Sequence, residues 1–297
     1  MSVPSSPFFR GRALEHTLLT IRQALAEDGT DLTSNAVFAP EDSLRAVIVA
    51  KEEAVLAGLP LIPLILEEGS RLEPGRWKVV RHAREGERLS PGEEIILMEG
   101  GARLLLRCER VILNFICHLS GIASLTRRYA DRLRGSGITL LDTRKTLPGL
   151  RFPEKYAVLA GGGRNHRMDL SAMLMLKDNH LDAGGGVASA VALVRAAYGP
   201  VPPLEVECRT LGEVEEALLC RVDRIMLDNM DAPALEAALR RIPAEVEVEV
   251  SGGLSLDSLD GLLALAGSRK PDFVSVGRIT HSAPQADFSL RLERLCS

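Results

Sequence analysis

The chain has few cysteines, little net charge and no long uninterrupted apolar run. Its five cysteines have neither CxxC nor zinc-type spacing, so we expect neither a disulfide framework nor a zinc site. With a net charge of −4, the protein is not expected to have the basic surface that binds nucleic acid. The apolar run 54–66 contains Pro60 and Pro63 and is too short to span a membrane. The first residues lack the apolar core of a secretory signal, so we expect a cytoplasmic protein without nucleic-acid or membrane partners.

The arrangement of apolar residues differs between the two parts of the chain. Before about residue 135 the pattern is mixed: it predicts helices over 14–25 and 114–133, with strands in 45–58 and 94–106. From residue 138 onward, apolar strands alternate with helical stretches such as 211–219, 233–239 and 256–265. This alternation indicates βαβ units with parallel strands, and it fits either a closed α/β barrel or an open doubly wound sheet.

Six successive strands of this second part are each followed by residues capable of polar chemistry. The carboxyl ends of parallel strands lie at one edge of the sheet, where active sites of α/β proteins are built. We therefore expect one site, to which every strand contributes. The strand ends carry Arg144 and Lys145, Lys177, Glu207, Asp228, Ser251-Gly252-Gly253, and Gly277-Arg278.

Cationic side chains gather near the first two of these strands and in the loop between them. Guanidinium and ammonium groups that converge suit a small polyanion such as a dicarboxylate. The alternative is that each cation pairs with a neighbouring carboxylate: Arg144 with Asp142, Arg167 with Asp169, and Lys177 with Asp178. The cationic set comprises Arg144, Lys145, His166, Arg167 and Lys177.

Acidic and glycine-rich strand ends predict the other half of the site. Glu207 and Asp228 supply the oxygen ligands that Mg²⁺ takes beside substrate phosphates. We expect one of Glu205 and Glu207 to point inward. The glycine-rich segments 251–253 and 275–277 follow the last two strands, where α/β barrels commonly bind phosphate. A cationic pocket, an acidic pair and a phosphate site together indicate transfer of phosphoribosyl from a diphosphate donor to an acidic acceptor.

At this point the sequence resembles the quinolinate phosphoribosyltransferase family, the decarboxylating enzymes of NAD biosynthesis that are also called nicotinate-nucleotide pyrophosphorylases (carboxylating). The matching segments cover most of the chain in order, and the TRKT, NHR, KDNH and SGG set is highly specific. They are EDGTDLTS (27–34), ERVILNFICHLSGIAS (109–124), LDTRKTLPGLR (141–151), EKYAVLAGGGRNHRMDLS (154–171), LKDNH (176–180), EVEC (205–208), IMLDN (225–229), VSGG (250–253) and DFVSVGRITHSAPQADFSL (272–290).

The resemblance implies an N-terminal α/β sandwich domain over residues 1–120 and a C-terminal α/β barrel of about six parallel strands over 121–297. The last residues would return to the first domain. It also implies a homodimer or higher homo-oligomer with shared active sites, and Mg²⁺ as cofactor. The reaction would join quinolinate and phosphoribosyl diphosphate, giving nicotinate mononucleotide, CO₂ and diphosphate.

The resemblance also assigns roles position by position. It implies a quinolinate pocket of Arg144, His166, Arg167 and Lys177, with Thr143 and Lys145 beside it. Arg110 would reach the site of the neighbouring subunit, just before the helix predicted at residue 114. Glu207 and Asp228 would face the ribose and the Mg²⁺-diphosphate, with any contact to the metal made indirectly. Phosphate would be held by Ser251, Gly252, Gly253, Ser275, Val276 and Gly277, with His281 nearby. Lys145, Lys177, Glu207 and Asp228 would be catalytic.

Three alternatives stay open. Lys145 or Lys177 could form a Schiff base in an aldolase on a phosphate-binding barrel. A member of the same family could use a different acid as acceptor. A purely structural or binding protein fits poorly, because it gives no reason for six functionalised strand ends.

Overall fold

The computed structural model describes residues 6–198, 203–264 and 269–294. The chain divides into two compact units. Unit 1 comprises Met1–Arg127, Thr146–Gly162 and Arg278–Ser297, and unit 2 comprises Arg128–Lys145 and Gly163–Gly277. The predicted boundary between residues 120 and 121 falls inside a helix, α4 (Ala102–Arg132), that continues from unit 1 into unit 2. That boundary stays a prediction about the division of the sequence.

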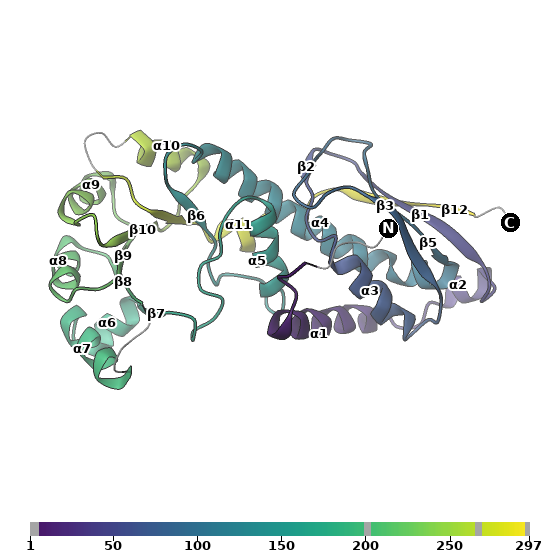
Figure 1. Ribbon diagram of the computed structural model, residues 1–297, viewed down its shortest axis with the longest axis horizontal. Coiled ribbons are helices and arrows are strands. Elements are labelled where there is room, and N and C mark those ends of the chain that lie inside the picture. Colours follow the sequence, from purple (N-terminus) through teal and green to yellow (C-terminus); the bar gives the residue numbers. More distant parts are fainter. Residues whose placement is uncertain (1–5, 199–202, 265–268, 295–297) are drawn as a thin grey trace. The chain divides into compact units, whose positions relative to one another are not determined.

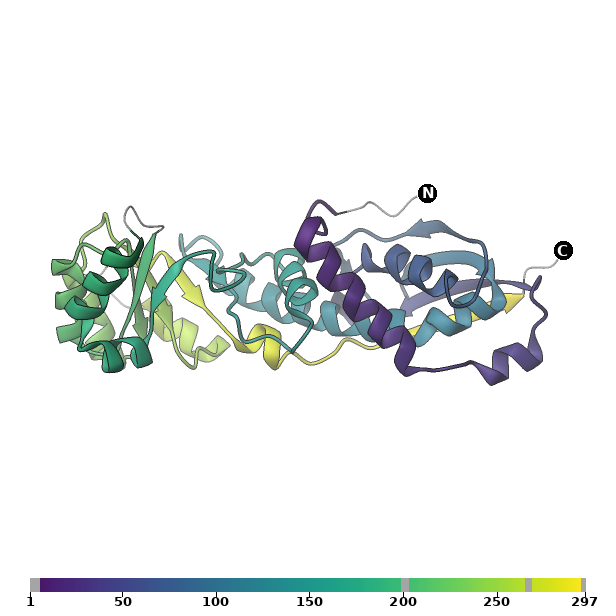
Figure 2. The same ribbon diagram turned by 90° about the horizontal axis from the view of Figure 1, so that it is seen from below.

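Unit 1 is built on an antiparallel sheet with helices against it (Figures 1 and 2). The strand order is β12-β1-β5-β3, so the end of the chain returns to pair with β1. The sheet consists of β1 (Ser43–Ala50), β3 (Trp77–His82), β5 (Glu94–Gly101) and β12 (Phe288–Arg294), beside the short pair β2 (Ala54–Val55) and β4 (Arg88–Leu89). The helices are α1 (Gly11–Glu27), α2 (Leu32–Val37), α3 (Leu61–Ser70), α4, α5 (Arg151–Ala160) and α11 (Arg278–His281).

Helix α4 begins twelve residues earlier than the predicted start at residue 114, directly after β5. Arg110 therefore lies within this helix and not before it, so that expectation was wrong. Length and composition alone would allow α4 to cross a membrane, but 67% of its most apolar window is buried inside the chain. Its apolar side chains Ile112, Leu113, Ile116 and Leu119 are buried as well, so this face needs no second subunit to cover it.

Unit 2 contains six parallel strands, with helices on the outer side (Figures 1 and 2). Their order, β6-β11-β10-β9-β8-β7, places strands that are successive in the chain side by side, from β7 to β11, and then returns to β6. The strands are β6 (Thr139–Leu141), β7 (Leu174–Leu176), β8 (Leu204–Cys208), β9 (Arg224–Asp228), β10 (Glu247–Ser251) and β11 (Phe273–Ser275). The helices are α6 (Asp178–Gly184), α7 (Val187–Tyr198), α8 (Leu211–Leu219), α9 (Ala232–Arg241) and α10 (Leu256–Ala264).

This strand order is that of an α/β barrel, because a doubly wound sheet would reverse direction at a switch point near its middle. The prediction of about six parallel strands in a barrel-type arrangement is confirmed. Within the described residues no ladder joins β6 to β7; instead Leu141 at the end of β6 forms a parallel bridge with Arg164. The loop that carries His166 and Arg167 therefore begins beside this edge of the sheet.

Close backbone packing in unit 1 generates a stability prediction at Gly121. A Cβ atom at this position of α4 would collide with the backbone carbonyl of Pro284. We expect Gly121→Ala to destabilise the protein by about 1–3 kcal/mol, the usual range for overpacking. Gly261→Ala in α10 is the control, since a Cβ there meets nothing within 4 Å. The control should be neutral or slightly stabilising. Thermal unfolding of both variants tests this, and equal melting temperatures would contradict it.

Candidate active site

A cavity of about 560 Å³ opens at the carboxyl ends of the parallel strands of unit 2. All six strands or the segments that follow them contribute to its walls, as the pattern of strand ends predicted. The predicted residues that line it are Thr143, Arg144, Lys145, His166, Arg167, Lys177, Glu207, Asp228, Ser251, Gly252, Gly253 and Ser275. The cavity is also lined by Met175, Asp178, Met226, Asn229 and Glu249, which sequence reasoning did not place there.

Arg144 and Arg167 are the cations that remain available to a ligand. Neither makes an ion pair with a carboxylate in the part of the chain that the structure describes, and the Nε of Arg144 is buried without a hydrogen-bond partner. Arg167 donates from Nη1 to the carbonyl oxygen of Met173 at 3.0 Å. Burial, and then the charge of Arg144, lower the pKa of Arg167. Two guanidinium groups this close favour an anion between them.

The neighbouring carboxylates Asp142 and Asp169 are engaged elsewhere. Asp142 is buried and accepts hydrogen bonds from Asn165 Nδ2 at 2.6 Å and from the backbone N–H of His166 at 2.8 Å. Asp169 accepts from the hydroxyl and the backbone N–H of Ser171. These contacts shape the loop that presents His166 and Arg167 to the cavity.

Lys177 differs from the arginines because it has a carboxylate partner. Its ammonium forms an ion pair with Glu207, on the neighbouring strand β8. The alternative partner, Asp178, accepts instead from the backbone N–H of Asn179 at 2.7 Å. The pair joins the end of β7 to the end of β8, across two strands that the sequence separates by thirty residues.

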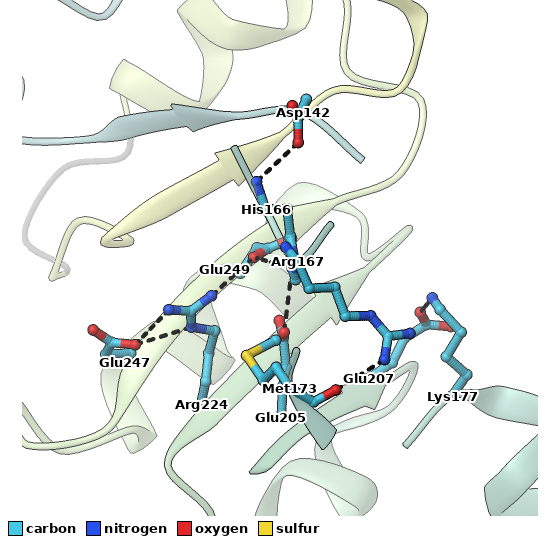
Figure 3. A network of polar contacts seen from close by, with 10 residues as sticks. All are labelled: Asp142, His166, Arg167, Met173, Lys177, Glu205, Glu207, Arg224, Glu247 and Glu249. Atoms are coloured by element: carbon cyan, nitrogen blue, oxygen red, sulfur yellow. Dashed lines mark hydrogen bonds and ion pairs between the residues drawn. The ribbon is translucent and has the colours of Figure 1, made fainter. Parts of the chain in front are cut away.

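A buried acidic pair, which was not predicted as part of the site, lies against His166 (Figure 3). Glu205 on β8 and Glu249 on β10 are 0% exposed, and each places an oxygen 3.3 Å from His166 Nε2. The expectation that only one of Glu205 and Glu207 points inward was wrong, because residues two apart on a strand share a face. Alternation of acidic and apolar residues in LEVEC (204–208) and EVEVEV (245–250) was the available signal.

Burial and neighbouring charges shift the pKa values of His166 and Glu205. Burial alone would lower the pKa of His166, but Glu205 and Glu249 outweigh it and raise that pKa to about 9. Burial, with the nearby charge of Glu249, raises the pKa of Glu205. Ligand atoms of the three side chains lie within 4.8 Å of one another, a spacing that could also hold a metal ion. Arg224 Nη1, 3.6 Å from Glu249, already supplies positive charge there.

The glycine-rich segment after β10 approaches its neighbours closely. Gly252 and Gly253 have φ of 99° and 56°, a left-handed backbone that favours glycine. A Cβ on Gly252 would also lie 2.7 Å from the backbone nitrogen of Asn229. Ser275, at the end of β11, is buried, and its hydroxyl has no hydrogen-bond partner among the residues that the structure describes. An anionic oxygen in the cavity would satisfy that donor.

Four of the predicted site residues do not line this cavity. Val276 is buried and donates its N–H to the carbonyl of Leu141 at 3.0 Å, so it holds the sheet together next to Ser275. Gly277 follows it outside the cavity lining. Arg110 and His281 belong to unit 1, where both are exposed, on α4 and at the end of α11. Their roles stay predictions.

Oxygen ligands suitable for a hard cation are present at one wall. Asp228 is partly exposed and accepts from Asn229 Nδ2 at 2.7 Å, which leaves carboxylate lone pairs toward the cavity. Glu207 is buried and shared with Lys177. A pair of this kind suits Mg²⁺ bound mainly through substrate phosphates and water, and fits poorly with a metal held by protein alone.

Comparison with known proteins gives matches over both parts of the chain. The model of the quinolinate phosphoribosyl transferase C-terminal domain matches residues 122–291, and that of the N-terminal domain matches residues 31–120. The chain is 41% identical over 267 residues to the probable nicotinate-nucleotide pyrophosphorylase [carboxylating] of Bacillus subtilis, covering 90% of this chain and 89% of the relative. It is 38% identical over 279 residues to the Mycobacterium leprae enzyme of that name, covering 92% and 96%.

Solved structures give the same result. The crystal structure of NadC from Streptococcus pyogenes matches with a TM-score of 0.86 and 38% identity, covering 99% of this chain and all of that one. Both family models, these relatives and this structure agree over both parts of the sequence. The chain therefore belongs to the quinolinate phosphoribosyltransferase family.

Proposed function

We propose that this protein transfers the phosphoribosyl group of 5-phosphoribosyl 1-diphosphate to quinolinate and removes one carboxyl group, as a step in NAD biosynthesis. The products are nicotinate mononucleotide, CO₂ and diphosphate. The observation that carries the proposal is one cavity in which Arg144 and Arg167 form no ion pair with a carboxylate of the described residues, while Glu207, Asp228 and the segment 251–253 occupy other strand ends.

The cationic side of the cavity suits the acceptor. A pyridine dicarboxylate carries two negative charges on adjacent ring carbons, and guanidinium groups bind carboxylates through paired hydrogen bonds. Arg144 and Arg167 hold the acceptor so that its ring nitrogen attacks the ribosyl carbon and diphosphate leaves. The pyridinium then accepts the electron pair of the breaking carbon–carboxyl bond, CO₂ departs, and the ring carbon takes up a proton.

The acidic and glycine-rich side suits the donor. Ser275, with its free hydroxyl, and the left-handed Gly252 and Gly253 support binding of a phosphate group. Mg²⁺ is the cofactor proposed here, and it would neutralise negative charge on the leaving diphosphate. Asp228 and Glu207 would hold it, in part through water or the diphosphate itself.

A Schiff-base mechanism is less well supported. Imine formation needs a lysine that gives up its proton, usually in an apolar pocket or beside another cation. Lys177 instead forms an ion pair with Glu207, and Lys145 is exposed. Neither arrangement prepares a nucleophilic amine.

Assembly into a homodimer or a higher homo-oligomer with shared sites is also part of the proposal. Arg110 is exposed on α4 of unit 1, although the apolar residues of that helix are covered within the chain. Support for a role of Arg110 in a neighbouring subunit thus comes from its exposure and from the family resemblance. Location in the cytoplasm likewise stays a prediction.

Acceptor choice tests the function directly. Purified protein incubated with quinolinate, phosphoribosyl diphosphate and Mg²⁺ should release CO₂ and form nicotinate mononucleotide. Nicotinate, which lacks the second carboxylate, should react at least about a hundredfold more slowly, because each lost charge-assisted contact costs roughly tenfold or more. Product analysis by chromatography measures both rates. Comparable rates with the two acids would contradict the dicarboxylate pocket.

Metal dependence tests the acidic wall. Asp228→Asn should lower kcat on the order of a hundredfold, the range seen when one group that stabilises transition-state charge is lost. Its melting temperature should change little, since Asp228 is partly exposed. Asp257→Asn, an exposed acid on α10 outside the cavity, is the matched control and should keep full activity. Undiminished turnover in excess chelator would rule out the proposed role of Mg²⁺.

Mixing two inactive variants tests whether sites are shared. If Arg110 serves the neighbouring site, a mixed dimer of Arg110→Ala and Lys177→Ala has both lesions in one site and leaves the other intact. Activity should then return to about half of the wild-type value per mixed dimer, as two-fold symmetry requires. Native mass spectrometry confirms subunit exchange. A mixture that exchanges and stays inactive would mean that Arg110 does not act across a subunit boundary.

A further inference from the structure

Glu205 and Glu249 lie on either side of β9, one on each neighbouring strand, and both point into the interior of unit 2 (Figure 3). Both are 0% exposed, and none of their four carboxylate oxygens has a hydrogen-bond partner among the described residues. Buried carboxylates without compensation are costly, so their arrangement has to be explained by nearby positive groups.

Two positive groups face this pair. His166 Nε2 lies 3.3 Å from Glu205 Oε2 and 3.3 Å from Glu249 Oε2. Arg224 approaches Glu249 at 3.6 Å but is held mainly by Glu247, at 2.7 and 3.0 Å, and by the ring of Phe273. His166 is therefore the group that both acids share.

His166 is also fixed on its other sides. Its backbone N–H donates to Asp142 Oδ1 at 2.8 Å, and its Nδ1 lies 2.6 Å from the backbone nitrogen of Arg167. A proton on Nε2 is then directed between the two acids. The ring thus connects the buried acids to the backbone of Arg167, whose guanidinium lines the cavity.

We infer that Glu205 and Glu249 are positioning residues for acceptor binding: they orient His166, and through it they hold Arg167 in place. The inference rests on the proposed function, which makes Arg167 a ligand of the acceptor carboxylates. In this role neither Glu205 nor Glu249 has to contact the acceptor directly. Arg144 and Arg167 repel each other, so Arg167 keeps its position only if its backbone and guanidinium are both restrained.

The amide variants Glu205→Gln and Glu249→Gln test this inference. An amide has no charge to pair with the His166 ring and brings donors of its own toward it, so the ring loses its fixed orientation. The dissociation constant for quinolinate, measured by calorimetry without phosphoribosyl diphosphate, should rise about tenfold in each variant, the effect of losing one charged contact. The KM for phosphoribosyl diphosphate should stay within about twofold, because those contacts lie elsewhere in the cavity.

Glu247→Gln is the matched control. Glu247 lies on the same strand two residues before Glu249 and binds Arg224, but it is half exposed and makes no contact with His166. It should leave quinolinate binding unchanged. The ¹⁵N shifts of the His166 ring should change in the two test variants and stay constant in the control, which a general loss of stability would not produce.

Two results would overturn the inference: wild-type affinity for quinolinate in folded Glu205→Gln and Glu249→Gln, or an equal loss in Glu247→Gln. Circular dichroism and melting temperature establish folding, and either amide variant alone suffices if the other does not fold. Turnover by the wild-type protein tests the proposed function separately. Protein that binds quinolinate without turnover would contradict that function while the binding comparison still decides the inference.

Discussion

Mutual repulsion between Arg144 and Arg167 is the constraint around which unit 2 is organised. Burial and the charge of Arg144 lower the pKa of Arg167, yet neither group has a carboxylate partner in the described part of the chain. Such an arrangement costs free energy in the empty protein, and a bound anion recovers it. The remainder of the fold supplies restraint: a carbonyl oxygen for the guanidinium of Arg167, and a buried Asp142 for the loop that precedes it.

The parallel strands bring these groups together because their carboxyl ends share one edge. Residues 140–145 contain the end of β6 and residues 174–177 contain β7, at opposite edges of the strand order, and β8 and β10, which carry the buried acids, lie between them. Buried acids therefore sit beneath a cationic cavity. Their negative charge lies close enough to influence Arg167, whose pKa the nearby Glu205 raises against the effect of burial. The cavity can then hold several cations without a neutralising carboxylate beside each one.

The sequence correctly predicted those features of the fold and site that are encoded by contiguous residues. Each strand end is a contiguous signal, so the six strands and most of the cavity lining followed from it, and helix α8 has the bounds that periodicity predicted. The predictions were wrong where the same residue pattern fits more than one kind of element, or where a residue's role depends on distant segments. An apolar stretch after Gly101 reads equally as strand or helix, so the start of α4 was misplaced. Glu249 was missed because the alternation in EVEVEV does not show which acid is buried, and its partners His166 and Arg224 come from other segments.

Lysine and arginine play different parts in the cavity, and the difference connects its two halves. Lys177 is neutralised by Glu207, whereas the arginines are not. A dicarboxylate that binds the ammonium of Lys177 has to compete with Glu207 for it. When the dicarboxylate takes Lys177 away from Glu207, the negative charge of Glu207 is no longer compensated. Glu207 and Asp228 lie on the same wall, so together they then attract a divalent cation more strongly. Under the proposed function, acceptor binding at the cationic side would therefore prepare the acidic side for the metal-bound diphosphate of the donor.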